Sequence, residues 1–510
     1  MTSISYPHLS QSFRICLAAA AVFGVGCSSS SSGSDATAGT PGSAGGALGG
    51  STAAGGSSTL AGAPGTGGIS GSGGASGASA LAGSGGAAPT GGGSAGGSAP
   101  AAGAGGSAPA AGAGGLSSAG SAGSAGSAGS AGSAGSAGSS GATVCVAKTA
   151  VANMKLGWNL GNSLDVPDAS KSDTAVETAW GNPLISAALL KAVSAAGFGA
   201  VRIPVTWIGR MGPAPSYTIS SAFVGRVEQV VKYALDAGLY VIINIHHDGG
   251  HNVTGKWLSL VDGSGQVTAA NTAAVTNEFK ALWSQIATRF ASYGDHLVFE
   301  SMNEVMVDYG TPKPEYYTVI NSLNQTFVDT VRATSGNNAT RCLVVPGYNT
   351  NIDYTVAGFV LPKDTSTGKL ILSDHYYDPF TFAGSAETHT WGAGNPGIDN
   401  WGQEDWVKSQ MAKLKSTFID KGVPMILGEY GAVNQAGYEN YRRYYLEYVT
   451  KAAHDVGITP FYWDNGGKNS GSDGFGLIDR ANNAVLYPTV LQALTRAVTS
   501  NYALTDVAKP

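Results

Sequence analysis

The chain has 510 residues, of which 43% are hydrophobic and only 12% are charged, and its formal net charge is −5. This length allows either up to three ordinary domains or one large α/β barrel with an extension. The chain lacks a basic stripe, so nucleic acid is not an expected partner, and the weak net charge favours a neutral substrate.

An export signal is predicted at the N-terminus. Arg14 precedes an apolar run over residues 15–26, which has the length of a signal-peptide core and is too short to span a bilayer. Cys27 follows and resembles the lipid-bearing cysteine of bacterial lipoproteins, although Gly24 replaces the leucine that usually stands three residues earlier. We expect residues 1–27 to be a signal peptide with a lipidation site at Cys27; an ordinary cleaved signal is the alternative. The protein is then exported, either as a cell-surface or outer-membrane lipoprotein or in secreted form.

Residues 28–143 form a low-complexity linker of Gly, Ala and Ser, with Asp35 as its one charged residue. This composition buries too little apolar surface to offset the entropy of ordering, so we expect a disordered tether with an r.m.s. reach of about 60 Å. All nine tryptophans follow it, which assigns the folding unit to residues 144–510. No later segment has 18 consecutive apolar residues, so membrane contact is expected only through a lipid on Cys27.

Two cysteines, Cys145 and Cys342, lie in the folding unit. Export permits a disulfide between them, and two buried free thiols are the alternative.

Short apolar runs alternate with longer amphipathic stretches through the folding unit. The runs typical of strands are residues 155–162, 200–207, 240–247, 296–304, 342–348, 370–377, 424–431 and 459–466. Helical periodicity is clearest over residues 183–196, 222–237, 270–293, 315–334, 404–421 and 438–456, and is weak over residues 349–362. Eight such units predict an α/β fold, a (β/α)₈ barrel. A doubly wound open sheet is the alternative, but no G-x-G-x-x-G motif follows the first strand.

Polar side chains stand at the carboxyl ends of the predicted strands, where a barrel places its active site. Glu304 stands at the end of the fourth predicted strand and Glu429 near the end of the seventh, which gives the pair of carboxyl groups that glycoside hydrolysis needs. Arg202, on the second strand, is expected to keep Glu429 ionised. Glu304, close to that anion and partly desolvated, is expected to hold its proton to higher pH.

These residues are also compatible with other roles. Arg202 and Glu429 alone are compatible with a structural ion pair. His246, His247, Asp248 and His251 resemble a metal cluster, but a third positioned ligand motif is missing and two glycines interrupt the spacing, so we expect no metal. Trp283 is expected in the core. Two of four tryptophans near the third and sixth strands are expected to line the cleft: Trp257, Trp391, Trp401 and Trp406.

The folding unit resembles glycoside hydrolase family 5, whose barrels carry the acid on strand four and the nucleophile on strand seven. The matching motifs run in order across residues 146–510: GWNLGN at 157–162, VRIP at 201–204, NIHH at 244–247, MNE at 302–304, HYY at 375–377, LGE at 427–429 and WDNG at 463–466. WGNP at 180–183 and GFGLIDR at 474–480 resemble subfamily 4, which consists largely of endo-β-1,4-glucanases. Val305 departs from the family pattern, which has proline after the acid.

The resemblance implies a retaining endo-β-1,4-glucanase that acts on β-glucan polysaccharide, without a cofactor, as a monomer. It implies roles for nine residues: Glu304 as acid/base, Glu429 as nucleophile, Asn303 on the sugar 2-OH, Arg202 and Tyr377 on Glu429, His246 and His247 in the glycone pocket, His375 near Glu304, and Trp463 as the floor. Alternatives on the same barrel are a xyloglucanase, a mixed-linkage glucanase or a mannanase. Alternatives of another class are a non-catalytic carbohydrate-binding surface protein and a phosphate-handling barrel, and the carboxyl pair argues against both.

Overall fold

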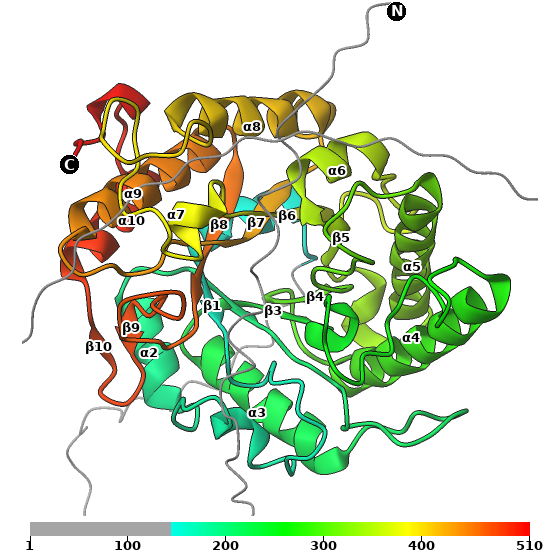
Figure 1. Ribbon diagram of the computed structural model, residues 1–510. Helices are drawn as coiled ribbons and strands as arrows, with labels where there is room; N and C mark the ends of the chain where they lie inside the picture. Colours follow the sequence, from blue (N-terminus) through cyan, green and yellow to red (C-terminus); the bar gives the residue numbers. More distant parts are fainter. Residues whose placement is uncertain (1–143) are drawn as a thin grey trace, which may run out of the picture. The chain divides into compact units, whose positions relative to one another are not determined.

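Eight parallel strands close into a barrel, with neighbours in chain order from β1 to β8 (Figure 1). The computed structural model describes residues 144–510, and the expected signal peptide and tether lie outside the described residues. The strands are β1 (Gly157–Leu160), β2 (Ala200–Ile203), β3 (Tyr240–Asn244), β4 (Leu297–Glu300), β5 (Leu343–Asn351), β6 (Leu370–Tyr376), β7 (Met425–Tyr430) and β8 (Ile458–Asp464). Pairing of β1 with β8 closes the ring, which confirms the predicted (β/α)₈ barrel and excludes the open sheet.

The helices lie outside the strands and cover them (Figure 1). They are α2 (Ala187–Ala195), α3 (Ser221–Asp236), α4 (Ala269–Arg289), α5 (Pro314–Arg332), α6 (Ile352–Gly358), α7 (Phe380–Ala383), α8 (Glu404–Thr417), α9 (Glu439–Asp455) and α10 (Pro488–Thr499). Ser186, Ser220 and Thr268 cap α2, α3 and α4 by accepting a backbone N–H. The weak pattern after the fifth strand forms α6, which has only seven residues.

Short 3₁₀ helices and one hairpin complete the described residues. The 3₁₀ helices are η2 (Val176–Thr178), η3 (His247–Gly249), η4 (Gly336–Ala339), η5 (Ile419–Lys421) and η6 (Leu504–Asp506). The hairpin pairs β9 (Ile478–Asp479) with β10 (Ala484–Val485) in antiparallel fashion. None of the described helices is both long and apolar enough to cross a bilayer.

The fourth strand ends earlier than predicted. It was expected to reach Glu304, but β4 stops at Glu300. The next residues leave the regular ladder while the Ser301 and Asn303 N–H groups still bond to carbonyls of neighbouring segments. Glu304 therefore sits on a short, well-fixed segment just above the barrel rather than on the strand itself.

Helix α1 (Ala147–Met154) closes the barrel at the amino ends of the strands. Its buried face packs against apolar side chains that point into the barrel from seven strands: Ala200, Ile242, Val298, Val344, Ile371, Ile426 and Phe461. The apolar layer at this end is called the floor below. Directly before α1, Cys145 forms a disulfide with Cys342, with a Cα–Cα distance of 5.7 Å. The structure therefore selects the disulfide over two free thiols.

Candidate active site

A polar layer lies inside the barrel directly above the apolar floor. Side chains alternate along a strand, so the residue two positions beyond each floor residue also points inward. On β2, β3, β4 and β6 these residues are polar and buried: Arg202, Asn244, Glu300 and Ser373. Along each of these strands, the inward-facing side chain therefore changes from apolar, in the floor, to polar, at the mouth, within two residues.

Arg202 is the centre of this layer and has no exposed surface. Its Nε donates to Glu300 Oε2 at 2.7 Å, and its Nη1 donates to Glu429 Oε1 at 2.8 Å and to Asn159 Oδ1 at 3.0 Å. Its Nη2 donates to Asn303 Oδ1 at 2.7 Å. Burial alone lowers the pKa of Arg202, but the two carboxylates raise it overall. Arg202 therefore stays charged and fixes four side chains around it.

Glu304 and Glu429 face each other across the mouth. An oxygen of Glu304 and an oxygen of Glu429 lie within 4.8 Å of each other. Retaining glycosidases place their carboxyl groups about 5–5.5 Å apart, and inverting enzymes place them about 6.5–9.5 Å apart to admit a water. The short separation matches the retaining arrangement.

Glu304 is paired with His375, whose Nδ1 lies 2.7 Å from Glu304 Oε1. Burial raises the pKa of Glu304 to about 7, with Arg202 acting in the opposite direction. Burial lowers the pKa of His375 to about 4, although Glu429 raises it in part. At neutral pH His375 is therefore neutral, and Glu304 keeps a proton to a pH at which an ordinary glutamate has lost it.

Glu429 receives two direct hydrogen bonds, from Arg202 and from the hydroxyl of Tyr377 at 3.1 Å from Oε2. Burial raises its pKa, while His375 and Arg202 lower it. Arg202 thus favours ionisation of Glu429 as expected, but desolvation outweighs this attraction and leaves the pKa raised overall. Arg202 nevertheless donates to Glu429 and not to Glu304, so its charge favours ionisation of Glu429 over Glu304.

His246 lies beside Glu429, with its Nε2 4.0 Å from Oε1. Asn244 fixes the tautomer: its Oδ1 accepts from the Val205 N–H, so its Nδ2 donates to His246 Nδ1 at 3.2 Å. Burial holds the pKa of His246 well below 6.5, so the neutral ring carries its hydrogen on Nε2, toward the mouth. Trp463 lies nearly parallel to this ring, at an interplanar angle of 4°.

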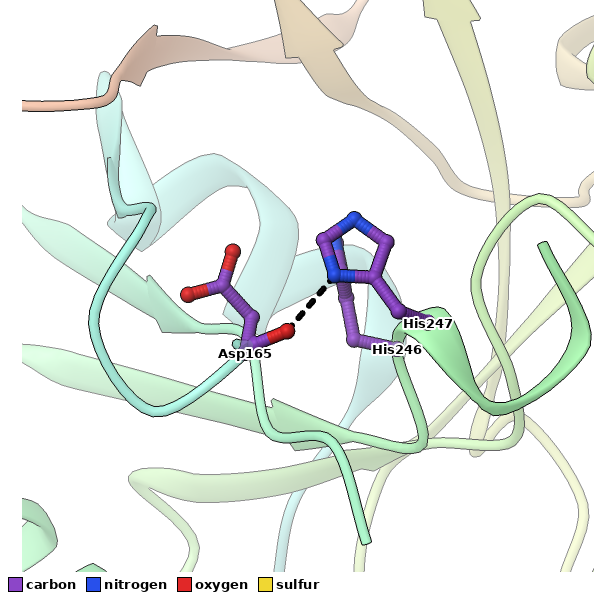
Figure 2. Close-up of side chains that lie close together, drawn as sticks. All are labelled: Asp165, His246 and His247. Atoms are coloured by element: carbon purple, nitrogen blue, oxygen red, sulfur yellow. Dashed lines mark hydrogen bonds between the residues drawn. The ribbon is translucent and has the colours of Figure 1, made fainter. Parts of the chain in front are cut away.

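His247 points to the loop after β1 rather than to the carboxyl pair. Figure 2 shows its ring beside His246, with Nδ1 facing the backbone oxygen of Asp165; the two atoms are 2.6 Å apart. Its ring also meets the edge of Trp180, which is 41% exposed. His247 therefore links the barrel mouth to an exposed aromatic side chain.

Two groups place metal-ligating atoms within 4.8 Å: Asp165 with His246 and His247, and Glu304 with His375 and Glu429. In the first group the Asp165 carboxylate accepts two backbone N–H groups, and both histidine Nδ1 atoms have partners. The second group contains the carboxyl pair itself. Hydrogen bonds among the described residues therefore already engage several of the ligating atoms in both groups.

The metal cluster considered from the sequence is not assembled. Asp248 instead accepts from the Trp207 N–H and from the Trp257 indole, and burial raises its pKa to about 7. His251 Nδ1 bonds to the carbonyl of Val307.

The tryptophans divide between core and loops. Trp283 is buried, as predicted. Trp391 is also fully buried and packs against tyrosines of α9, which removes it from the four expected near the cleft. Trp257 and Trp406 are half-buried and bonded to Asp248 and Asp378, so a place in the cleft stays a prediction for them. The cavity beside Glu304 is lined by other side chains, among them Met306, Tyr309, Asn349, Tyr377 and Phe380.

Three buried charged residues of the site were given no role from the sequence. Glu300 interrupts the apolar run of the fourth predicted strand, but only the strand register of the structure, in which it ends β4, shows that it faces inward. Asp464 accepts from the Trp158 indole and from two backbone N–H groups of the hairpin segment. Arg480 donates to the Gly161 carbonyl and to Asp464, which ties the loop after β1 to the end of β8. Arg480 ends the GFGLIDR motif.

A barrel with two carboxyl groups this close, one bonded to arginine and one to a neutral histidine, defines a glycoside hydrolase site of the retaining type. The family model described as cellulase (glycosyl hydrolase family 5) matches residues 166–469. The chain belongs to glycoside hydrolase family 5, which confirms the resemblance of its motifs.

Similar proteins are endoglucanases by name. Endoglucanase A of Paenibacillus barcinonensis is 42% identical over 372 residues, which cover 69% of this chain and 90% of the relative. A xyloglucan-specific endo-β-1,4-glucanase of Bacteroides ovatus is 40% identical over 334 residues, covering 62% of this chain and 64% of the relative. The solved structure of a GH5-4 broad specificity endoglucanase from Bacteroides salanitronis is 45% identical with a TM-score of 0.65, covering 69% of this chain and 94% of that one.

Proposed function

We propose that the protein is a retaining endo-β-1,4-glucanase with Glu304 as acid/base and Glu429 as nucleophile. The observation that carries the proposal is the carboxyl pair within 4.8 Å, in which Arg202 donates to Glu429 and not to Glu304, and His375 contacts Glu304 at 2.7 Å. These different neighbours favour ionisation of one carboxyl and protonation of the other, as double displacement requires.

In the first step Glu304 donates its proton to the glycosidic oxygen while Glu429 attacks the anomeric carbon, so the C–O bond breaks and a glycosyl ester forms. Asn303 uses its Oδ1 for Arg202, which leaves its Nδ2 to donate to a sugar hydroxyl. In the second step the Glu304 carboxylate takes a proton from water, and the resulting hydroxide equivalent releases the sugar with its original configuration.

The substrate proposed is a β-1,4-glucan, and xyloglucan is the second candidate because a xyloglucan-specific relative is 40% identical. We expect hydrolysis of carboxymethylcellulose, mixed-linkage glucan and xyloglucan, and at least about tenfold slower hydrolysis of mannan. Release of reducing ends from the four polymers measures this, with chain-shortening followed by viscosity. Mannan as the preferred substrate, or no hydrolysis of any glucan, would contradict the proposal.

We also propose that the enzyme works outside the cytoplasm, anchored through Cys27. The disulfide between Cys145 and Cys342 supports export, because disulfides persist in oxidising compartments. The apolar run that ends before Cys27 supports the anchor.

Cys27→Ala is expected to move the enzyme from the membrane fraction to the soluble fraction, because the variant has no thiol to carry the lipid. Cell fractionation followed by glucanase assay measures the distribution, with Cys16→Ala as the matched control that leaves it unchanged. Wild-type enzyme found free in the culture medium would contradict the anchor and leave plain secretion.

A further inference from the structure

Glu300 lies on β4 and shares Arg202 with the proposed nucleophile. Arg202 Nε is 2.7 Å from Glu300 Oε2, and Arg202 Nη1 is 2.8 Å from Glu429 Oε1. Neither Arg202 nor Glu300 has exposed side-chain surface. One buried guanidinium, that of Arg202, therefore balances the negative charges of both Glu300 and Glu429, which share it.

The other groups that face Glu429 supply no second positive charge. His246, after β3, and His375, on β6, have ring nitrogens 4.0 and 3.7 Å from its oxygens, and burial lowers the pKa of both rings. Tyr377, after β6, donates a neutral hydrogen bond, and Glu304, after β4, is a second acid. The guanidinium is therefore the one full positive charge against Glu429 at neutral pH among these neighbours.

A second hydrogen bond, from Asn244, also holds Glu300 in place. Asn244 Nδ2 donates to the same Oε2 at 2.9 Å, and the Val205 N–H fixes the orientation of the amide. The other oxygen of Glu300, Oε1, has no hydrogen-bond partner among the described residues. The buried charge of Glu300 therefore depends on Arg202 as its counter-charge, and the charge of Arg202 depends in part on Glu300.

The reaction changes this balance. When Glu429 becomes an ester of the anomeric carbon, it loses its negative charge. Without Glu300 the guanidinium would then remain buried with no counter-charge, which is a costly state. We propose that Glu300 is a positioning residue of the reaction: it stays ionised and balances Arg202 while Glu429 is esterified. This inference rests on the proposed double displacement.

The test times the two steps separately with 2,4-dinitrophenyl 2-deoxy-2-fluoro-β-cellobioside on the full chain. Dinitrophenolate leaves as Glu429 bonds to the anomeric carbon, which inactivates the enzyme, and water later restores it. Glu300→Gln is expected to slow inactivation at least about tenfold, because it removes negative charge where positive charge develops. Reactivation is expected to be unchanged or faster, because it restores the pairing of Arg202 with Glu429.

The pH profile supplies a second measurement. Glu429 attacks only when ionised, so kcat/KM falls as the pH drops through its pKa. In Glu300→Gln the guanidinium acts on Glu429 alone and a like charge is gone, and both changes lower that pKa. The acidic limb is therefore expected to move down by about one pH unit.

The matched control removes the carboxylate of another buried ion pair, between Arg332 and Asp364 at 2.8 Å. Asp364→Asn is expected to lower stability and leave both rates unchanged. If Glu300→Gln does not fold, Glu300→Asp replaces it, which withdraws the charge from Arg202 and slows inactivation selectively by a smaller factor. Equal slowing of both steps, or no change in either, overturns the role of Glu300. Failure of the wild type to form a glycosyl-enzyme would instead overturn the double displacement.

Discussion

Glu429→Ala is expected to abolish hydrolysis of every glucan, with a loss in kcat of about 10⁴-fold or more. The alanine has no oxygen to attack the anomeric carbon, and Arg202 and Tyr377 are left pointing at an empty position. Release of reducing sugar from carboxymethylcellulose measures the loss. The fold should persist, because the removed side chain lies at the mouth and not in the floor; near-UV circular dichroism checks this.

Glu304→Ala separates the two roles. It is expected to be severely slowed on glucan but still to form the glycosyl-enzyme with an activated aryl glycoside, because a good leaving group needs no proton. Added azide should then attack the intermediate in the absence of the Glu304 carboxylate and give a β-glycosyl azide. An α-configured azide from Glu304→Ala, or azide rescue of Glu429→Ala with a β product, would reverse the assignment.

Arg202→Ala is expected to lower the free energy of unfolding by about 3–5 kcal/mol, because it leaves the buried carboxylates Glu300 and Glu429 without their cation. Guanidinium unfolding at pH 7 measures the loss. Loss of the cation raises the folded-state pKa of Glu429 further above its unfolded value. The contribution of Glu429 to stability is then greatest at low pH and disappears as the pH rises, so the deficit should shrink toward pH 5.

The double variant Arg202→Ala/Glu300→Gln is the internal control for this prediction. With one of the two buried charges removed, part of the lost stability should return at pH 7. A deficit of Arg202→Ala that does not change between pH 5 and pH 7, or that the second substitution deepens, would show that packing and not unpaired charge is the cause.

The sequence was sufficient for the barrel and for many residues of its mouth, because apolar strand runs repeat eight times and charged or histidine residues stand at the ends of five of them. Glu304, Glu429, Arg202, Asn303, His375 and Tyr377 come together as expected. The net pKa direction of Glu429 could not be predicted, because it depends on how completely neighbouring loops remove water. Glu300 was missed for a related reason. Whether a residue faces the barrel interior depends on strand register, and β4 ends four residues before the predicted point.

The disulfide at the barrel floor decides how the folded part bears tension. Cys145 is bonded to Cys342, which stands directly before β5, and α1 begins only afterwards at Ala147. A pull on the chain from the side of residue 144 therefore passes through a covalent link into the strands before it reaches α1. The carboxyl pair lies at the opposite end of the barrel. If the enzyme is held at this point while it acts on a fixed polysaccharide, the disulfide bears the tension and α1 stays packed. The carboxyl groups at the other end of the barrel then keep their relative positions.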